Sequence, residues 1–77
     1  MSEFPRQNPD IILQAITSNL AALNDVLQVA ARRAAEGLTY AQQGEQNMAI
    51  GSTFDLDDLL AQATALFGAA MALHRKK

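Results

Sequence analysis

The sequence predicts an all-α protein in which a long helix, a tight turn and a shorter antiparallel helix form a helical hairpin. Two observations lead to this prediction. Apolar residues recur three and four apart without a break from residue 13 to residue 48, and a second such series runs from 56 to 73. This spacing is typical of one face of an amphipathic helix or a coiled coil. Both prolines lie within the first nine residues, ahead of both series.

Residues 1–8 are expected to form an extended leader, because they contain Pro5 among polar residues. The first helix is expected to begin near residue 9. Asn8 is a favourable N-cap, and Pro9 suits the first helical position, where its missing N–H is not needed. Asp10 complements the positive end of the helix dipole.

A break near Gly37 is the main alternative for the first helix. Gly37 followed by Leu38 has the pattern of a helix C-cap with its hydrophobic contact. Thr39 and Gln42 have the spacing of a capping box, which would begin a new helix. A chain that breaks here would form three helices and close as a three-helix bundle.

An uninterrupted first helix is favoured because the heptad spacing passes through Gly37 and Gly44 in phase, and a true break has no reason to preserve that spacing. We expect this helix to cover residues 9–50 and a turn to cover 51–54, beginning at Gly51. The residues expected to face inward are Leu13, Ile16, Leu20, Leu23, Leu27, Ala30, Ala34, Gly37, Ala41, Gly44 and Met48.

The second helix is predicted over residues 55–75. Asp55 is a strong N-cap, and Phe54 and Leu59 have the spacing of a hydrophobic staple around it. Basic residues at the other end complement the negative end of the helix dipole. Its inward positions are Leu56, Leu59, Ala63, Leu66, Ala70 and Leu73, flanked by Leu60 and Phe67.

The unequal lengths of the two helices predict an intermolecular interface. At about 1.5 Å per residue the first helix would be roughly 60 Å long and the second roughly 30 Å. The second would then cover only residues 30–50 of the first, and the leucine-rich half would lack a partner. Each large apolar side chain that is buried contributes about 1.5–3 kcal/mol. The expected interface residues are Leu13, Ile16, Leu20, Leu23, Leu27, Leu59, Leu66, Phe67 and Leu73.

The composition agrees with a single small domain that is completed as a helical bundle by self-association. A chain of 77 residues has a thin margin of stability, and it contains no cysteine for a disulfide and one histidine, too few for a zinc site. The net charge of −2 and the six basic residues do not form the basic face of a nucleic-acid binder. No run of about 20 apolar residues predicts a membrane span, and no signal peptide is apparent, so the cytoplasm is expected.

No catalytic, cofactor or metal site is predicted. His74 lies at the opposite end of its helix from the nearest acidic residues in the sequence and is better explained as a complement to the helix dipole. The aspartates at 55, 57 and 58 lack the ligand spacing of a calcium loop and are better explained by helix capping. Ser52 and Thr53 have no nearby histidine in the sequence that would activate a hydroxyl group. The protein is therefore not expected to be an enzyme.

Residues 12–23 and the Ala-Gln-Gln at 41–43 resemble the subunits of R-bodies, small alanine-rich helical proteins of bacteria that build ribbons. The resemblance covers part of the chain and rests on residues that are common in helices. The helix from Phe54 to His74 departs from the pattern of that family. We therefore assign no family from the sequence.

The sequence favours a small non-catalytic interaction protein that binds to itself through its apolar heptad positions. A first alternative is an adaptor, co-chaperone or inhibitor that lays the same positions into a groove of a different protein. A second is a membrane-active helical peptide that uses the apolar second helix. The absence of tryptophan and of a distributed basic face counts against this second alternative.

Overall fold

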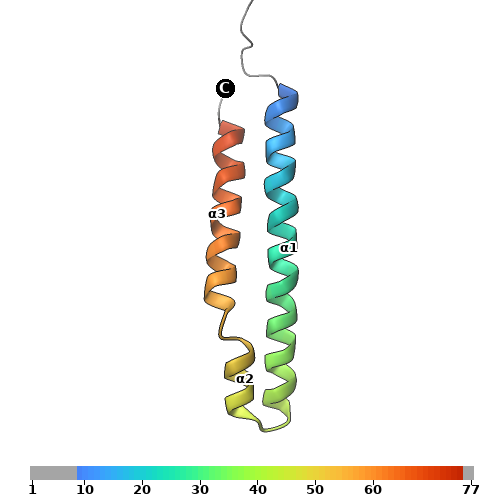
Figure 1. Cartoon of the computed structure of the whole chain (residues 1–77), viewed down its shortest axis with the longest axis vertical. Helices are drawn as coiled ribbons and strands as arrows, with labels where there is room; N and C mark the ends of the chain where they lie inside the picture. Colours follow the sequence, from blue (N-terminus) through green and yellow to red (C-terminus); the bar gives the residue numbers. More distant parts are fainter. Residues whose placement is uncertain (1–8, 76–77) are drawn as a thin grey trace, which may run out of the picture.

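The computed structural model describes residues 9–75, which form three α-helices and no strand (Figure 1). Helix α1 spans Pro9–Gln42, α2 spans Gln46–Ser52 and α3 spans Leu56–Arg75. The all-α prediction is therefore confirmed. The predicted leader over 1–8, with the N-cap Asn8, lies outside the described residues.

Helices α2 and α3 run back along α1 in the opposite direction, so that the beginning of α1 and the end of α3 lie at the same end of the molecule (Figure 1). We call residues 46–75 the return arm. Two contacts fix its position along α1. The Arg33 side chain of α1 donates a hydrogen bond to the Asp55 side chain, just before α3, and Gly37 of α1 lies against the end of α2.

Helix α1 begins at Pro9 and continues through Gly37, as the sequence predicts, but it ends at Gln42 and not at residue 50. The stop is at Gly44, whose φ of +79° is favourable only for glycine. The Glu45 N–H donates to the Tyr40 carbonyl at 2.9 Å, and the Gly44 N–H donates to the Ala41 carbonyl at 3.0 Å. These two bonds form a Schellman motif.

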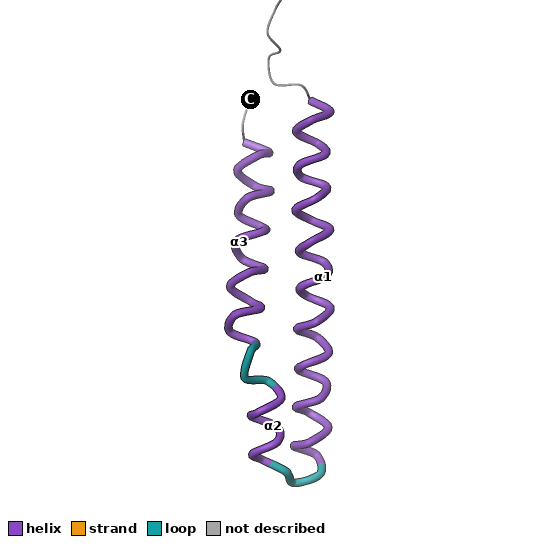
Figure 2. The backbone as a smooth tube through the Cα atoms, viewed as in Figure 1, coloured by secondary structure: helices purple, strands orange, loops and turns teal. Residues whose placement is uncertain are grey.

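The turn predicted over 51–54 is also wrong. Gly51 lies inside α2, and the chain reverses direction at residues 43–45 (Figure 2). Residues 53–55 form a bend that joins α2 to α3 without reversing the chain. At this bend the Thr53 hydroxyl donates to the carbonyls of Ala49 and Ile50, at 3.1 and 3.2 Å. The same carbonyls also accept from the Ser52 hydroxyl and the Thr53 N–H, respectively, at the end of α2.

Helix α3 agrees with its prediction to within one residue, since it begins at Leu56 and ends at Arg75. Asp57 and Asp58 lie in its first turn, and His74 and Arg75 lie in its last turn. The two aspartates and Arg75 have the charge that the helix dipole favours at their respective ends.

The two arms meet along one seam of buried and half-buried residues. Its buried members in the described chain are small: Ala30, Ala63, Ala70 and Gly37. No large side chain of residues 9–75 is fully buried. The half-buried seam residues of α1 are Ile12, Ile16, Asn19, Leu23, Val26, Arg33 and Tyr40, and those of the return arm are Ala49, Ser52, Leu56, Leu59, Leu66 and Leu73.

The early reversal changes which half of α1 has a partner. Because Arg33 lies beside Asp55 and the arms are antiparallel, the 20 residues of α3 lie along the part of α1 that precedes Arg33. This is the leucine-rich half, which the sequence analysis expected to be left without a partner within the chain. That expectation is wrong, because it placed the reversal of the chain at 51–54.

The Schellman motif gives the first prediction. Gly44→Ala should lower the free energy of unfolding by about 1–2 kcal/mol, because an alanine Cβ disfavours positive φ. Gly68→Ala is the matched control, since an added methyl group there meets nothing within 4 Å and the site is inside α3. The control should raise stability by about 0.5–1 kcal/mol. Urea unfolding followed by circular dichroism measures both changes, and changes of the same sign would contradict the assignment of the cap.

Gly37 gives the second prediction. A Cβ at Gly37 would lie 2.5 Å from the Thr53 Cγ2 atom and 3.2 Å from the Ala49 carbonyl oxygen. Gly37→Ala should therefore destabilise the protein by about 1–3 kcal/mol through overpacking. Adding Thr53→Ser to Gly37→Ala removes the clashing methyl group and keeps the hydroxyl donor, so it should restore part of the loss. Thermal unfolding of both variants and of Thr53→Ser alone tests this, and an unchanged or raised midpoint for Gly37→Ala would show that α2 does not pack closely on α1.

Candidate interaction surface

The seam divides the helix pair into two sides. Leu20 follows the seam residue Asn19, and Phe67 follows the seam residue Leu66, so the two occupy equivalent positions beside the seam. Two facing antiparallel helices are related by an approximate two-fold axis perpendicular to the plane of the pair. Rotation about this axis exchanges the helices and leaves each side of the pair in place. Equivalent flanking positions of α1 and the return arm therefore lie on the same side.

The ion pairs of Arg33 agree with this geometry. Glu36 precedes the seam residue Gly37, and Asp55 precedes the seam residue Leu56, so these two acids are also in equivalent positions. Both meet the same guanidinium group. Arg33 Nε donates to Asp55 Oδ2 at 3.1 Å, and Arg33 Nη1 lies 3.9 Å from Glu36 Oε1. This charged group therefore lies on the opposite side of the pair from Leu20 and Phe67.

The side of Leu20 and Phe67 carries most of the exposed large apolar side chains of the described residues. We call this side the apolar face. Positions that directly follow seam residues supply all of its members. Those on α1 and the return arm are Leu13, Leu20, Leu27, Leu38, Ile50, Leu60 and Phe67, and all seven are exposed. The other exposed large apolar side chains among residues 9–75 are Ile11, Met48 and Phe54.

The interface residues predicted from the sequence separate into two groups. Leu13, Leu20, Leu27 and Phe67 lie on the apolar face and are exposed. The other five are half-buried in the seam, where α1 and α3 pack on one another within the chain: Ile16, Leu23, Leu59, Leu66 and Leu73. The predicted inward stripe of α1 therefore combined one line of seam residues with one line of exposed residues.

Leu38, Ile50 and Leu60 belong to the apolar face but were not among the predicted interface residues. Leu38 and Ile50 lie on either side of the reversal at 43–45, which the sequence analysis did not place correctly. Leu60 was expected as a flanking residue, and the structure places it beside Leu59 on the exposed side. Its equivalence to Leu20 and Leu27 becomes visible only when the seam residues of both arms are known.

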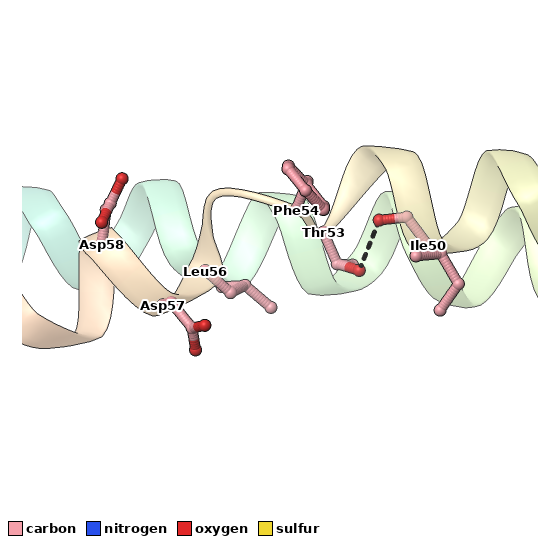
Figure 3. A pocket seen from close by; sticks show the side chains of 6 residues that line it. All are labelled: Ile50, Thr53, Phe54, Leu56, Asp57 and Asp58. Carbon is pink, nitrogen blue, oxygen red and sulfur yellow. Dashed lines mark hydrogen bonds between the residues drawn. The ribbon is translucent and has the colours of Figure 1, made fainter.

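An open hollow of ≈ 400 Å³ lies beside the bend between α2 and α3 (Figure 3). Its lining contains apolar side chains and two acids from the first turn of α3. The only hydrogen bond drawn there joins the Thr53 hydroxyl to the Ile50 carbonyl. The lining residues are Ile50, Thr53, Phe54, Leu56, Asp57 and Asp58. Since Phe54 is 82% exposed and nothing encloses the space, the hollow does not have the form of a closed ligand pocket.

No group of three or more histidine, cysteine, aspartate or glutamate side chains that could hold a metal ion is found within residues 9–75. Asp55 is engaged by Arg33, and Asp57 and Asp58 lie in the first turn of α3, as expected of residues near a helix N-terminus. His74 lies in the last turn of α3, at the other end of that helix from these acids.

The return arm, taken from Gln46 to Arg75, is long and apolar enough to cross a membrane, judged by length and composition only. No such segment is predicted from the sequence. Most of the residues concerned are exposed in the helix pair. The bend at residues 53–55 and the three aspartates beside it lie within this segment.

Comparison with known proteins adds no assignment. No family model, no curated protein and no solved structure matches this chain.

Proposed function

We propose that this protein is a small non-catalytic helical interaction protein that associates with a second copy of itself through the apolar face. The observation that carries the proposal is the position of Leu20, Leu27, Leu60 and Phe67. These side chains come from two helices, lie on one side of the pair, and remain exposed after the chain has folded. Contiguous apolar surface of this kind on a soluble protein is typical of an interaction site.

The small core supports the proposal. The buried residues Ala30, Ala63 and Ala70 contribute little apolar area, and the larger seam residues are only half-buried. Domains below about 70–80 residues rarely gain more than 3–5 kcal/mol from one core, and oligomerisation is a usual source of further stability. Covering the apolar face would remove further leucine and phenylalanine surface from water, at about 25 cal/mol per Å².

A second copy is favoured over a different protein as the occupant of this face. Covering the face would add stability to a fold with a small core, and a second copy is present wherever the chain is made. The charged group of Arg33, Glu36 and Asp55 lies on the opposite side of the pair, so packing two apolar faces together buries none of these charges. An adaptor that awaits a different protein would leave its apolar face in water, so that alone it would be monomeric, poorly folded or aggregating.

The third prediction is that the pure protein is a folded dimer at micromolar concentration. Sedimentation equilibrium should give twice the chain mass of 8.3 kDa. The thermal midpoint should rise with protein concentration, because association stabilises the folded state by mass action. A folded monomer with a concentration-independent midpoint would contradict self-association. A monomer that is poorly folded alone would instead favour the adaptor hypothesis.

Leu20→Asp and Ala21→Asp form the matched pair for this experiment. Leu20 lies on the apolar face, whereas the neighbouring Ala21 is exposed on the outside of α1. An aspartate at position 20 would bury an unpaired charge between two copies and should dissociate the dimer. Ala21→Asp carries the same charge and a similar loss of helix propensity, and should remain dimeric. Equal sedimentation of the two variants would show that the apolar face is not the interface.

The apolar return arm supports a second candidate, a membrane-active helical protein. The length and composition of Gln46–Arg75 are the observation that favours it. Asp55, Asp57 and Asp58 count against it, because acidic side chains are costly inside a bilayer. The fourth prediction is that the protein stays at the bottom of a flotation gradient with vesicles of phosphatidylcholine and phosphatidylglycerol. Flotation with the vesicles would favour this second candidate over self-association.

A further inference from the structure

The large side chains of the apolar face recur at matching levels on the two arms. Gly37 lies against Ser52, and both arms advance by about 1.5 Å per residue in opposite directions. Leu27 lies ten residues before Gly37. Gln62 lies ten residues after Ser52, and Leu60 is in the same turn of α3 as Gln62. Leu27 and Leu60 are therefore nearly level along the length of the pair.

The same count matches two further pairs. Leu20 lies seventeen residues before Gly37, and Ala69 lies seventeen residues after Ser52. Phe67 is in the same turn of α3 as Ala69. In the opposite direction, Leu38 lies one residue after Gly37 and Gly51 lies one residue before Ser52, so these two residues are level. Ile50 is the neighbour of Gly51. Three successive levels of the apolar face therefore each have one large side chain from α1 and one from the return arm, and Leu13 is the fourth large side chain of α1 on this face.

We propose that two copies pack with their apolar faces together about a two-fold axis that runs parallel to the helices, so that α1 of each copy lies against the return arm of the other. The proposal rests on the self-association proposed above and specifies its geometry. The product is a four-helix bundle in which neighbouring helices are antiparallel. Each of the three levels then holds four large side chains, for example Leu20 and Phe67 from both copies.

The other two-fold arrangement fits the residues less well. If the axis crossed the pair at right angles to the helices, α1 would lie against α1 of the second copy. Centring the apolar residues from Leu13 to Leu38 would then place Leu20 opposite Ala31 and Leu27 opposite Asn24 of the second copy. Leu60 and Phe67 would face one another across the two α3 helices, but the large side chains of α1 would face small or polar ones, which leaves voids and buries an amide group without a designated partner.

The size of the face agrees with a stable dimer. From Leu13 to Leu38 the face extends for roughly 38 Å at 1.5 Å per residue, and two adjacent helices are roughly 20 Å wide. The product is about 760 Å² per copy, compared with about 800 Å² per partner in interfaces of standard size. One second copy is therefore sufficient to cover the face.

The fifth prediction uses disulfide cross-linking, which is clean because the chain has no cysteine of its own. Leu27→Cys and Leu60→Cys are prepared as separate proteins, mixed, allowed to exchange subunits and oxidised with copper phenanthroline. The proposed axis places position 27 of one copy level with position 60 of the other, so a mixed disulfide should form. Mass spectrometry of the cross-linked peptides identifies it.

The control mixture is Leu60→Cys with Phe67→Cys. In the proposed arrangement these two positions lie at different levels, whereas the perpendicular axis brings them together across two α3 helices. A 60–67 disulfide without a 27–60 disulfide would overturn the proposed axis and leave self-association intact. Sedimentation of the reduced variants gives the separate control for the proposed function, because a monomer there would refute the dimer itself.

Discussion

Close contact between α1 and the return arm is the interaction on which the rest of the structure depends. The contact is made by residues with almost no side chain, Ala30, Ala63, Ala70 and Gly37, which allow the two backbones to approach. Many dispersion contacts form at such a crossing, but little apolar area leaves water. The large apolar side chains are consequently half-buried in the seam or exposed on the apolar face. This distribution, with small residues inside and large ones outside, differs from that of most monomeric domains.

The parts of the fold that could be predicted from the sequence are those specified by local signals. The start of α1 at Pro9 and the start of α3 after Asp55 follow from residues that suit helix N-termini. The continuity of α1 through Gly37 follows from the unbroken heptad spacing. The seam of α3 was also predictable, because Leu56, Leu59, Ala63, Leu66, Ala70 and Leu73 are the residues that its heptad pattern places inward and that the structure buries or half-buries.

The reversal of the chain was not predictable from spacing, because the apolar heptad series happens to continue through the Schellman glycine. Gly44 adopts a φ of +79°, but in the sequence it occupies an inward position of that series. This error displaced the return arm and changed the face assigned to α1. The line of Leu13, Leu20 and Leu27 therefore appeared to belong with Ile16 and Leu23, whereas the seam of α1 is completed by Ile12, Asn19 and Val26. The candidate surface could be recognised only after both arms were placed.

The bend at residues 53–55 has a consequence for how this chain can change in evolution. Ala49, Ser52, Leu56 and Leu59 keep the spacing of one unbroken helix, so the bend preserves the rotational phase of α3. Deleting one residue there would rotate α3 by about 100°. Asp57, Thr64 and His74 would then face α1, and Leu60 and Phe67 would leave the apolar face. Inserting one residue would instead turn Asp58 and Gln62 inward. Substitutions within the bend are thus less harmful than changes in its length, and related chains should differ here in residue identity and not in residue number.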